Sequence, residues 1–242
     1  MKKYSTIFFD LDGTLSYHDW NVYKNQCLQL LKNIMNEEFN FSNEVVENCC
    51  SKYFSMIYEN RFNQTLTNKN LIQNKFMNDF NLTKDDVQII TNLFYKQMRE
   101  FVKLEVTQYP ALIDAIAHLK QKGVNLVLAT NSYFPIEMVL QRLEWTGIDK
   151  ECFSYICDWG EMGYSKPNKE FFSEIVKKNN LDEKNVLMVG NNISYDGCCM
   201  GIGIDCIILT ENMSNDESNM KDYIKPQFMS NEEFANLVKQ TY

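Results

Sequence analysis

Residues 4–15, YSTIFFDLDGTL, decide the fold. The first half of this stretch is a nearly continuous apolar run, which is typical of a strand buried on both faces of a parallel sheet. Asp10 and Asp12 follow the run directly, and Gly13 allows the chain to turn after them. In open α/β sheets ligands bind outside the carboxyl ends of the strands, so we expect the two carboxylates to face one site. Such a pair can bind a hard cation or act as nucleophile and acid–base partners.

Further strands and helices alternate along the rest of the chain. Apolar runs that predict strands stand at 125–130 (NLVLAT), 186–190 (VLMVG) and 206–209 (CIIL). Predicted helix starts are Pro110, Pro135, Pro167 and Ser230, the last with Glu233 in a capping box. This alternation predicts an α/β fold, a Rossmann-like parallel sheet with helices on both faces.

The segment between the first strand and Pro110 has a different character. After Gly13 there is no glycine until Gly123 and no proline until Pro110. Apolar residues at helical spacing form stripes at 23–35, 45–57, 71–80 and 90–101, and Thr83 is a candidate N-cap. We therefore predict two domains: an α/β core made of residues 1–15 and 106–242, and an inserted all-helical domain of residues 16–105.

Composition narrows the class of protein. Of 242 residues, 45% are apolar and 23% are charged, so the chain can bury a sizeable core. The net charge is −8, and the basic residues form no stripe of the kind that binds duplex nucleic acid or an anionic membrane. No run approaches the ~18 apolar residues of a membrane span. We accordingly expect neither nucleic acid nor a membrane as a partner.

The cysteines indicate a reducing compartment. Cys49 and Cys50 are adjacent, as are Cys198 and Cys199, and no CxxC pair occurs among the eight cysteines. This spacing favours neither a disulfide framework nor a zinc ribbon. We expect the thiols to be buried and reduced, and the protein to be cytoplasmic.

Four segments, taken in chain order, resemble the motifs of the haloacid dehalogenase-like (HAD) hydrolase superfamily. The first is IFFDLDGTL at 7–15, and the second is LATN at 128–131, a strand that ends in Thr130 and Asn131. The third is GYSKP at 163–167, which places Lys166 before a proline, and the fourth runs from VGNN at 189–192 to Asp196. The resemblance spans residues 4 to about 210, and the helical insertion falls where this family places its type-1 cap domain.

The resemblance implies a phosphomonoester hydrolase with an aspartyl-phosphate intermediate. Asp10 would be the nucleophile, and Asp12 would protonate the leaving alkoxide and then activate water. Thr130 and Asn131 would hold the phosphoryl oxygens, and Lys166 would offset the crowded negative charge. Mg²⁺ would lie between Asp10, the Asp12 carbonyl and the substrate phosphate.

The fourth motif departs from the family pattern. An Asp is usual just after the glycine or one residue further on, but Asn191 and Asn192 occupy both places, and only Asp196 remains acidic. An amide oxygen can still ligate a hard cation, although it brings no charge. The candidate metal ligands are therefore Asp10, Asp12, Asp196 and either Asn191 or Asn192.

Three other functions compete with the phosphatase. A dehalogenase of the superfamily would lack the second acid, so Asp12 argues against it. A phosphomutase would keep both aspartates, and a non-catalytic binding protein would explain the acid-poor fourth motif. The substrate is expected to be a small soluble phosphorylated metabolite, whereas the sequence gives neither its identity nor the oligomeric state.

Two local patterns carry weaker expectations. His18, with Tyr17 and Trp20, stands where the insertion begins, so these residues could line the substrate entrance or pack at a hinge. The polar stretch at 210–222 is expected to be a loop without a role in the chemistry.

Overall fold

The computed structural model describes residues 2–59, 65–214 and 221–242. Six parallel strands form one sheet in the order β5-β4-β1-β6-β7-β8. Their bounds are β1 Thr6–Phe9, β4 Asn125–Leu128, β5 Tyr155–Ile156, β6 Val186–Gly190, β7 Asp205–Leu209 and β8 Gln227–Met229. Phe9 pairs with Leu128 on one side and with Val189 on the other, so three central strands end at one level.

The four strands predicted from apolar runs are all present, and the two edge strands were missed. The strands β5 and β8 have only two and three residues, and none of their residues is fully buried. Short, half-exposed segments lack the continuous apolar pattern that marks a central strand. For this reason edge strands are the part of a parallel sheet that is hardest to predict from sequence.

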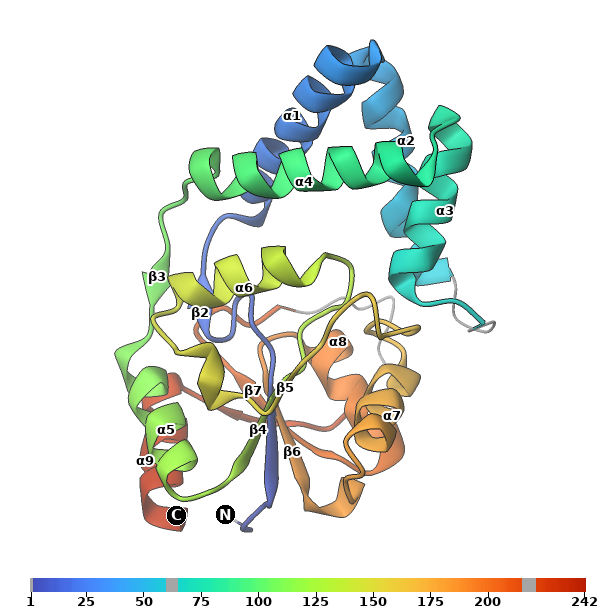
Figure 1. Ribbon diagram of the computed structural model, residues 1–242. Coiled ribbons are helices and arrows are strands. Elements are labelled where there is room, and N and C mark those ends of the chain that lie inside the picture. The colour runs from blue at the N-terminus through green and yellow to red at the C-terminus, as the bar shows by residue number, and fades with distance from the viewer. Residues whose placement is uncertain (1, 60–64, 215–220) are drawn as a thin grey trace.

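Helices cover both faces of the sheet, as predicted (Figure 1). One face packs against α5 Pro110–Gln121, α6 Ile136–Trp145 and α9 Asn231–Thr241. The other packs against α7 Lys169–Lys178 and against α8 Ile193–Gly197 with the 3₁₀ turn that follows it, Cys198–Ile202. In β1, Ile7 and Phe9 enter the first core, whereas Phe8 enters the second. This alternation buries both sides of each central strand.

The starts of the helices largely follow the predicted caps. Pro110 is the first residue of α5, and Ser230 forms a capping box with Glu233 at the start of α9. The prediction at Pro167 was wrong: α7 begins at Lys169, with Asn168 in the N-cap position. Lys166 and Pro167 therefore belong to a loop ahead of the helix.

The insertion is helical over most of its length. It contains α1 Trp20–Phe39, α2 Asn43–Glu59, α3 Asn68–Phe80 and α4 Lys84–Phe101, and Thr83 caps α4 as predicted. Ile34, Val46, Phe76 and other apolar residues form a core of their own between these helices. Val45 departs from its predicted stripe because it is 43% exposed, and the side chain at residue 57 lies outside the described part.

A two-stranded ribbon joins the two ends of the insertion. The strand β2, Ser16–Tyr17, pairs antiparallel with β3, Thr107–Gln108. The sequence analysis did not predict this ribbon because two-residue strands carry no periodicity. The pairing brings the point where the chain leaves the sheet next to the point where it returns.

The insertion helices lie over the carboxyl ends of the strands (Figure 1). The backbone N–H of Asn68 donates to the carbonyl of Met162 at 2.8 Å, and its side-chain amide donates to Ser132 Oγ at 2.9 Å. The side chain of Gln141 on α6 donates to the carbonyl of Met98 on α4. These buried hydrogen bonds fix the insertion above the sheet.

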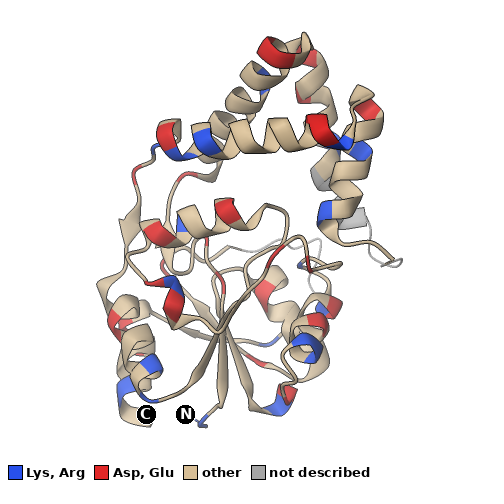
Figure 2. Cartoon of the chain, viewed as in Figure 1, with Lys and Arg blue, Asp and Glu red and all other residues tan. Residues whose placement is uncertain are grey.

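Nearly all charged residues lie outside the main sheet. Side chains of both signs are interspersed along the outer helices (Figure 2), and Asp205 is the single charged residue in the six strands described. All eight cysteines lie in the described ranges and are free thiols, five of them buried. Within those ranges no helix is both long and apolar enough to cross a bilayer.

Candidate active site

A cavity of about 500 Å³ opens at the carboxyl ends of β1, β4 and β6. We call it the strand-end pocket. Every residue that the sequence singled out lines it: Asp10, Asp12, Thr130, Asn131, Lys166, Asn191, Asn192 and Asp196. They come from four separate segments of the chain, and the parallel sheet brings the ends of those segments together.

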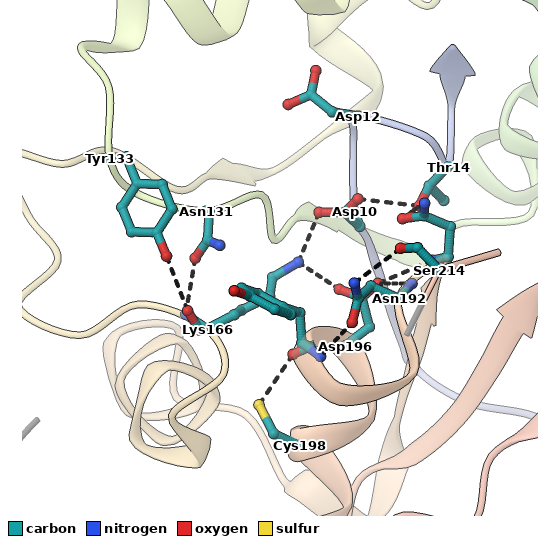
Figure 3. Close-up of polar contacts among 12 residues, drawn as sticks. Asp10, Asp12, Thr14, Asn131, Tyr133, Lys166, Asn192, Asp196, Cys198 and Ser214 are labelled. Carbon is teal, nitrogen blue, oxygen red and sulfur yellow. Dashed lines mark hydrogen bonds and ion pairs between the residues drawn. The ribbon is translucent and has the colours of Figure 1, made fainter. Parts of the chain in front are cut away.

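The centre of the pocket is a buried ion-pair triad (Figure 3). Lys166 Nζ lies 2.7 Å from Asp10 Oδ1 and 2.6 Å from Asp196 Oδ1. Lys166 and Asp196 are each 1% exposed, and Asp10 is 8% exposed. Two carboxylates and one ammonium group are thereby held within hydrogen-bond distance away from bulk water.

Burial and charge act against each other in this triad. Burial raises the pKa of Asp10 to about 6; the Lys166 ammonium opposes this effect and the Asp196 carboxylate adds to it. Burial alone would lower the pKa of Lys166, but Asp10 and Asp196 together raise it above its usual range. At pH 7 Lys166 is thus a fixed cation and Asp10 is predominantly a carboxylate.

The other carboxylate oxygen of Asp10 also accepts a hydrogen bond. Thr14 Oγ1 lies 3.1 Å from Asp10 Oδ2 and 3.2 Å from Asn191 Oδ1, so the hydroxyl bridges the first and fourth motifs. Gly13 permits this approach because its φ is +87° and because a Cβ there would overlap the amide of Asn191. The carboxylate of Asp10 and the amide oxygen of Asn191 therefore face the same small volume.

The side chains of the two asparagines in the fourth motif make different hydrogen bonds. Asn192 Oδ1 accepts the backbone N–H groups of Ser194 and Tyr195, so Asn192 is the N-cap of α8. Asn191 instead directs its oxygen toward Thr14 and donates its amide to the carbonyl of Asn212. Asp196 Oδ2 accepts the backbone N–H groups of both asparagines, which fixes the loop around the carboxylate.

Gly190 makes room for the carboxylate of Asp196, and this leads to a testable prediction. A Cβ at Gly190 would overlap the side chain of Asp196, whereas one at Gly160 would be 3.5 Å from its nearest neighbour. Gly190→Ala should displace Asp196 and lower turnover on the order of a hundredfold, because small misplacements in a site are costly. Gly160→Ala is the matched control. Steady-state kinetics of the folded variants check the prediction, and equal turnover in the two would contradict it.

Asp12 lines the same pocket but turns away from the triad (Figure 3). Its two carboxylate oxygens share the single N–H of Arg142 Nε, which lies 2.9 Å from Oδ1 and 3.2 Å from Oδ2. His18 Nε2 lies 3.7 Å from Asp12 Oδ1, and burial lowers the pKa of His18, so the ring is neutral at pH 7. The expectation that both carboxylates face one site holds for the pocket, but each has its own cationic partner.

Arg142 is the functional candidate that the sequence analysis missed. It is 1% exposed, and it donates from Nη1 to the Tyr23 hydroxyl at 3.2 Å and to the Met138 carbonyl at 3.0 Å. Its guanidinium lies over the rings of Trp20 and Phe134 at 5.7 and 5.4 Å. Arg is scarce in this chain, and Arg142 stands among Val139, Leu140 and Leu143 in the helix predicted after Pro135, which is the signal that could have marked it.

The second motif supports the Lys166 loop. Asn131 Oδ1 accepts the backbone N–H of Lys166 at 2.8 Å, and the Tyr133 hydroxyl donates to the Lys166 carbonyl at 3.1 Å. Thr130 is 2% exposed and lines the pocket beside them. Asn131 thus also orders the segment that carries the buried lysine.

The polar stretch after β7 starts as a loop, as predicted, and its first residues also line the pocket. Asn212 donates to the Gly13 carbonyl at 3.2 Å and to the Tyr109 hydroxyl. Ser214 Oγ accepts from the amide of Asn192 at 2.9 Å. The first residues of this stretch therefore brace the loops of the first and fourth motifs, while 215–220 lie outside the described residues.

The donor atoms of the pocket suit Mg²⁺. The oxygens of Asp10, Asp196 and Asn191 are hard ligands, and Mg²⁺ is usually held by one or two carboxylates together with substrate oxygens and water. Among the described residues no cluster of three or more His, Cys, Asp or Glu side chains forms a metal site of its own. The residues present thus fit a cation that is completed by substrate rather than caged by protein.

Comparison with known proteins identifies the family. The model of the haloacid dehalogenase-like hydrolases matches residues 4–196. A search of curated proteins gave no significant match. Since the family model covers most of the chain, the protein belongs to the haloacid dehalogenase-like hydrolases, and it is a hydrolase.

Solved structures share the fold at low sequence identity. A predicted phosphoglycolate phosphatase from Haemophilus somnus is 19% identical, with TM-score 0.56 over 98% of this chain and 99% of that one. A provisionally assigned HAD hydrolase from Bacillus subtilis, YfnB, was crystallised with magnesium (18%, TM-score 0.55, 98% and 99% covered). A provisionally assigned β-phosphoglucomutase from Thermotoga maritima is 14% identical (TM-score 0.54, 98% and 99% covered). At these identities the likeness concerns the fold alone.

Proposed function

We propose that this hydrolase is a Mg²⁺-dependent phosphomonoesterase that works through an aspartyl-phosphate on Asp10. The observation that carries the proposal is the Lys166 ammonium held between Asp10 and Asp196 at the strand ends. A fixed cation there offsets the negative charge that gathers when a phosphate dianion meets a carboxylate. The magnesium-bound fold neighbour supports the choice of metal.

The reaction has two displacements. Asp10 Oδ attacks phosphorus, the P–O ester bond breaks, and the leaving alkoxide takes a proton from Asp12. Water then attacks the same phosphorus while Asp12 accepts its proton, which regenerates Asp10 and releases inorganic phosphate. Thr130 and Asn131 hold the phosphoryl oxygens, and Lys166 remains protonated throughout.

Mg²⁺ would be held by Asp10, the Asp12 carbonyl, Asp196 and the amide oxygen of Asn191. When bound, it would supply a positive charge that neutralises the phosphoryl oxygens. Asn191 is favoured over Asn192 because the oxygen of Asn192 already caps α8. Burial raises the pKa of Asp10, so protons should compete with the cation below about pH 6.

A phosphate-release assay tests the function directly. p-Nitrophenyl phosphate should be hydrolysed in the presence of Mg²⁺, and hydrolysis should stop on addition of a chelator. Absence of turnover with every phosphorylated compound would favour the non-catalytic alternative. Transfer of phosphate within a sugar phosphate, without release to water, would favour the phosphomutase.

The general-acid role of Asp12 gives a prediction that depends on the leaving group. Asp12→Asn should lower turnover of alkyl phosphates about a thousandfold and that of p-nitrophenyl phosphate only about tenfold, since nitrophenolate needs little protonation. The substitution should leave the local structure in place, because an Asn side chain can still accept the hydrogen bond that Arg142 donates to Asp12. Comparing kcat across esters of graded leaving-group acidity checks this, and an equal loss for all esters would contradict the role.

The fourth motif predicts a weak Mg²⁺ site that one substitution strengthens. Asn191→Asp should lower the half-saturating Mg²⁺ concentration about fivefold, because it adds one charge to a partly solvated site. Asn192→Asp is the matched control, since Asp also serves as an N-cap and would leave the metal site unaltered. Calorimetric Mg²⁺ titration and activity titration of the three proteins decide it. A fivefold gain in Asn192→Asp instead would show that Asn192 is the ligand.

The helical insertion would act as a cap domain. We place the boundaries at residues 16–105, with 1–15 and 106–242 as the catalytic core. The hydrogen bonds of Asn68 and Gln141 hold the cap over the strand-end pocket, which suits a small soluble phosphorylated metabolite. Because all eight cysteines are free thiols, we propose a cytoplasmic enzyme. Because the sequence has no basic stripe, we propose that it binds neither nucleic acid nor membrane; its oligomeric state stays open.

A further inference from the structure

A second cavity of about 620 Å³ adjoins the strand-end pocket. Its walls come mainly from α1, α2 and residues 133–138, and Ile72 of α3, Phe94 of α4 and Trp159 complete them. Trp20, Tyr133 and Phe134 line both cavities, so the two share an aromatic wall. A ligand with its phosphate beside Lys166 can therefore extend past these rings into the second cavity.

The walls of this cavity are predominantly aromatic and apolar. Seven of the seventeen described residues that line it are aromatic, including Trp20, Tyr23, Phe94, Tyr133, Phe134 and Trp159. We call it the aromatic pocket. Lys24 and Glu47 are the charged residues among those seventeen. Flat ring systems stack favourably on such walls, in offset or edge-to-face geometry.

The two cysteines of the pocket add to its apolar character. Burial raises the pKa of Cys27 to about 11 and that of Cys50 to about 12, so both thiols are neutral at pH 7. A neutral thiol behaves as a small apolar side chain. A sugar or a second phosphate placed against the apolar walls would lose its water there.

We propose that the aromatic pocket receives the leaving group, and that the substrate class is a phosphomonoester with a flat aromatic body and no second anionic group. The inference rests on the proposed function, because it assigns the phosphate end to the strand-end pocket. Trp20 is the residue best placed to stack, since the residue is 37% exposed and its ring contacts the Phe134 ring at 5.6 Å between centroids. Hydrolysis then yields a phenol or an aryl alcohol, which the apolar walls also accommodate.

The kinetic test compares two aryl esters whose leaving groups are similarly acidic. The kcat/KM for 2-naphthyl phosphate should exceed that for phenyl phosphate about tenfold, because the second ring buries additional apolar surface. Leu28→Trp places a large side chain in the aromatic pocket from α1, where Leu28 is partly exposed and can accept the change. In this variant the ratio of the two kcat/KM values should fall to near one.

Two further variants provide a second test of the aromatic pocket and a control. Cys50→Trp fills the pocket from α2 and should lower the same ratio, so the inference does not depend on one variant folding. Val45→Trp is the matched control, because Val45 lies on the same helix, is 43% exposed and is outside both cavities. The ratio in Val45→Trp should equal that of the wild type. Circular dichroism and thermal melting establish that each variant is folded.

A binding measurement tests the aromatic pocket independently of catalysis. Calorimetric titration of 2-naphthyl phosphate into Asp10→Asn should give a Kd that Leu28→Trp, in the same background, weakens about tenfold. If no ester is hydrolysed but this binding difference is found, the aromatic pocket stands and the proposed function falls. If both aryl esters are hydrolysed equally and the filled variants keep the wild-type ratio, the phosphatase stands and the aromatic pocket is refuted.

Discussion

Asp10→Asn should lower phosphate release by at least about a thousandfold while the protein stays folded. The amide cannot form an acyl-phosphate, so only binding and electrostatic effects remain. Stability should change little because the ionised form of Asp10 is disfavoured by burial, which is the reason its pKa is raised to about 6. Steady-state kinetics on protein shown by mass spectrometry to be free of deamidation provide the measurement.

The pH dependence of stability offers an independent check on this variant. Because the folded-state pKa of Asp10 is raised, its contribution to stability is full below its ordinary pKa and is lost as the pH rises through about 6. The melting temperature of Asp10→Asn should lack this part of the pH dependence. Asp114→Asn, on the exposed face of α5, is the control. Activity above a tenth of wild type in Asp10→Asn would rule out the covalent mechanism.

Lys166→Met should be the most destabilising substitution in the site. It leaves Asp10 and Asp196 buried without their shared cation, and removing one partner of a buried ion pair costs about 3–5 kcal/mol in the free energy of unfolding. Turnover should fall about a hundredfold to a thousandfold, because the fixed charge near the phosphate is lost. Urea denaturation measures the first effect and phosphate release the second.

A double variant distinguishes the two effects of Lys166. Lys166→Met combined with Asp196→Asn removes the repulsion between carboxylates, so much of the stability should return while the activity should not. Lys178→Met, on the exposed end of α7, shows what the loss of an ordinary lysine does. Equal stability of the single and double variants would show that the triad is not an electrostatic unit.

The sequence predicted which residues meet at the sheet edge better than it predicted the contacts between them. Central strands and first-motif aspartates follow local rules, since apolar runs and a turn glycine are visible in the chain itself. The partner of Asp12 was not visible, because Arg142 lies 130 residues away and only the fold brings them together. Long-range ion pairs of this kind have no signature in spacing.

The roles of the two asparagines in the fourth motif could not be predicted from the sequence either, although the two residues are adjacent. Asn191 and Asn192 are adjacent and identical in type, so the sequence cannot say which oxygen faces the site. The structure separates them because α8 begins at Ile193 and takes Asn192 as its N-cap. The wrong start predicted for α7 has a similar origin, since a proline marks a turn as readily as a helix.

The pairing of β2 with β3 makes the helical insertion exchangeable. Ser16 lies opposite Gln108 and Tyr17 opposite Thr107, so entry and exit of the inserted segment are neighbours. A shorter, longer or unrelated segment could be grafted between them without a change in any strand of the main sheet, because the closure of a loop depends only weakly on its length. The side chains that the insertion contributes to the two cavities could then change while Asp10, Lys166 and Asp196 stay fixed. Under the proposed function, this junction would let specificity and catalysis evolve separately.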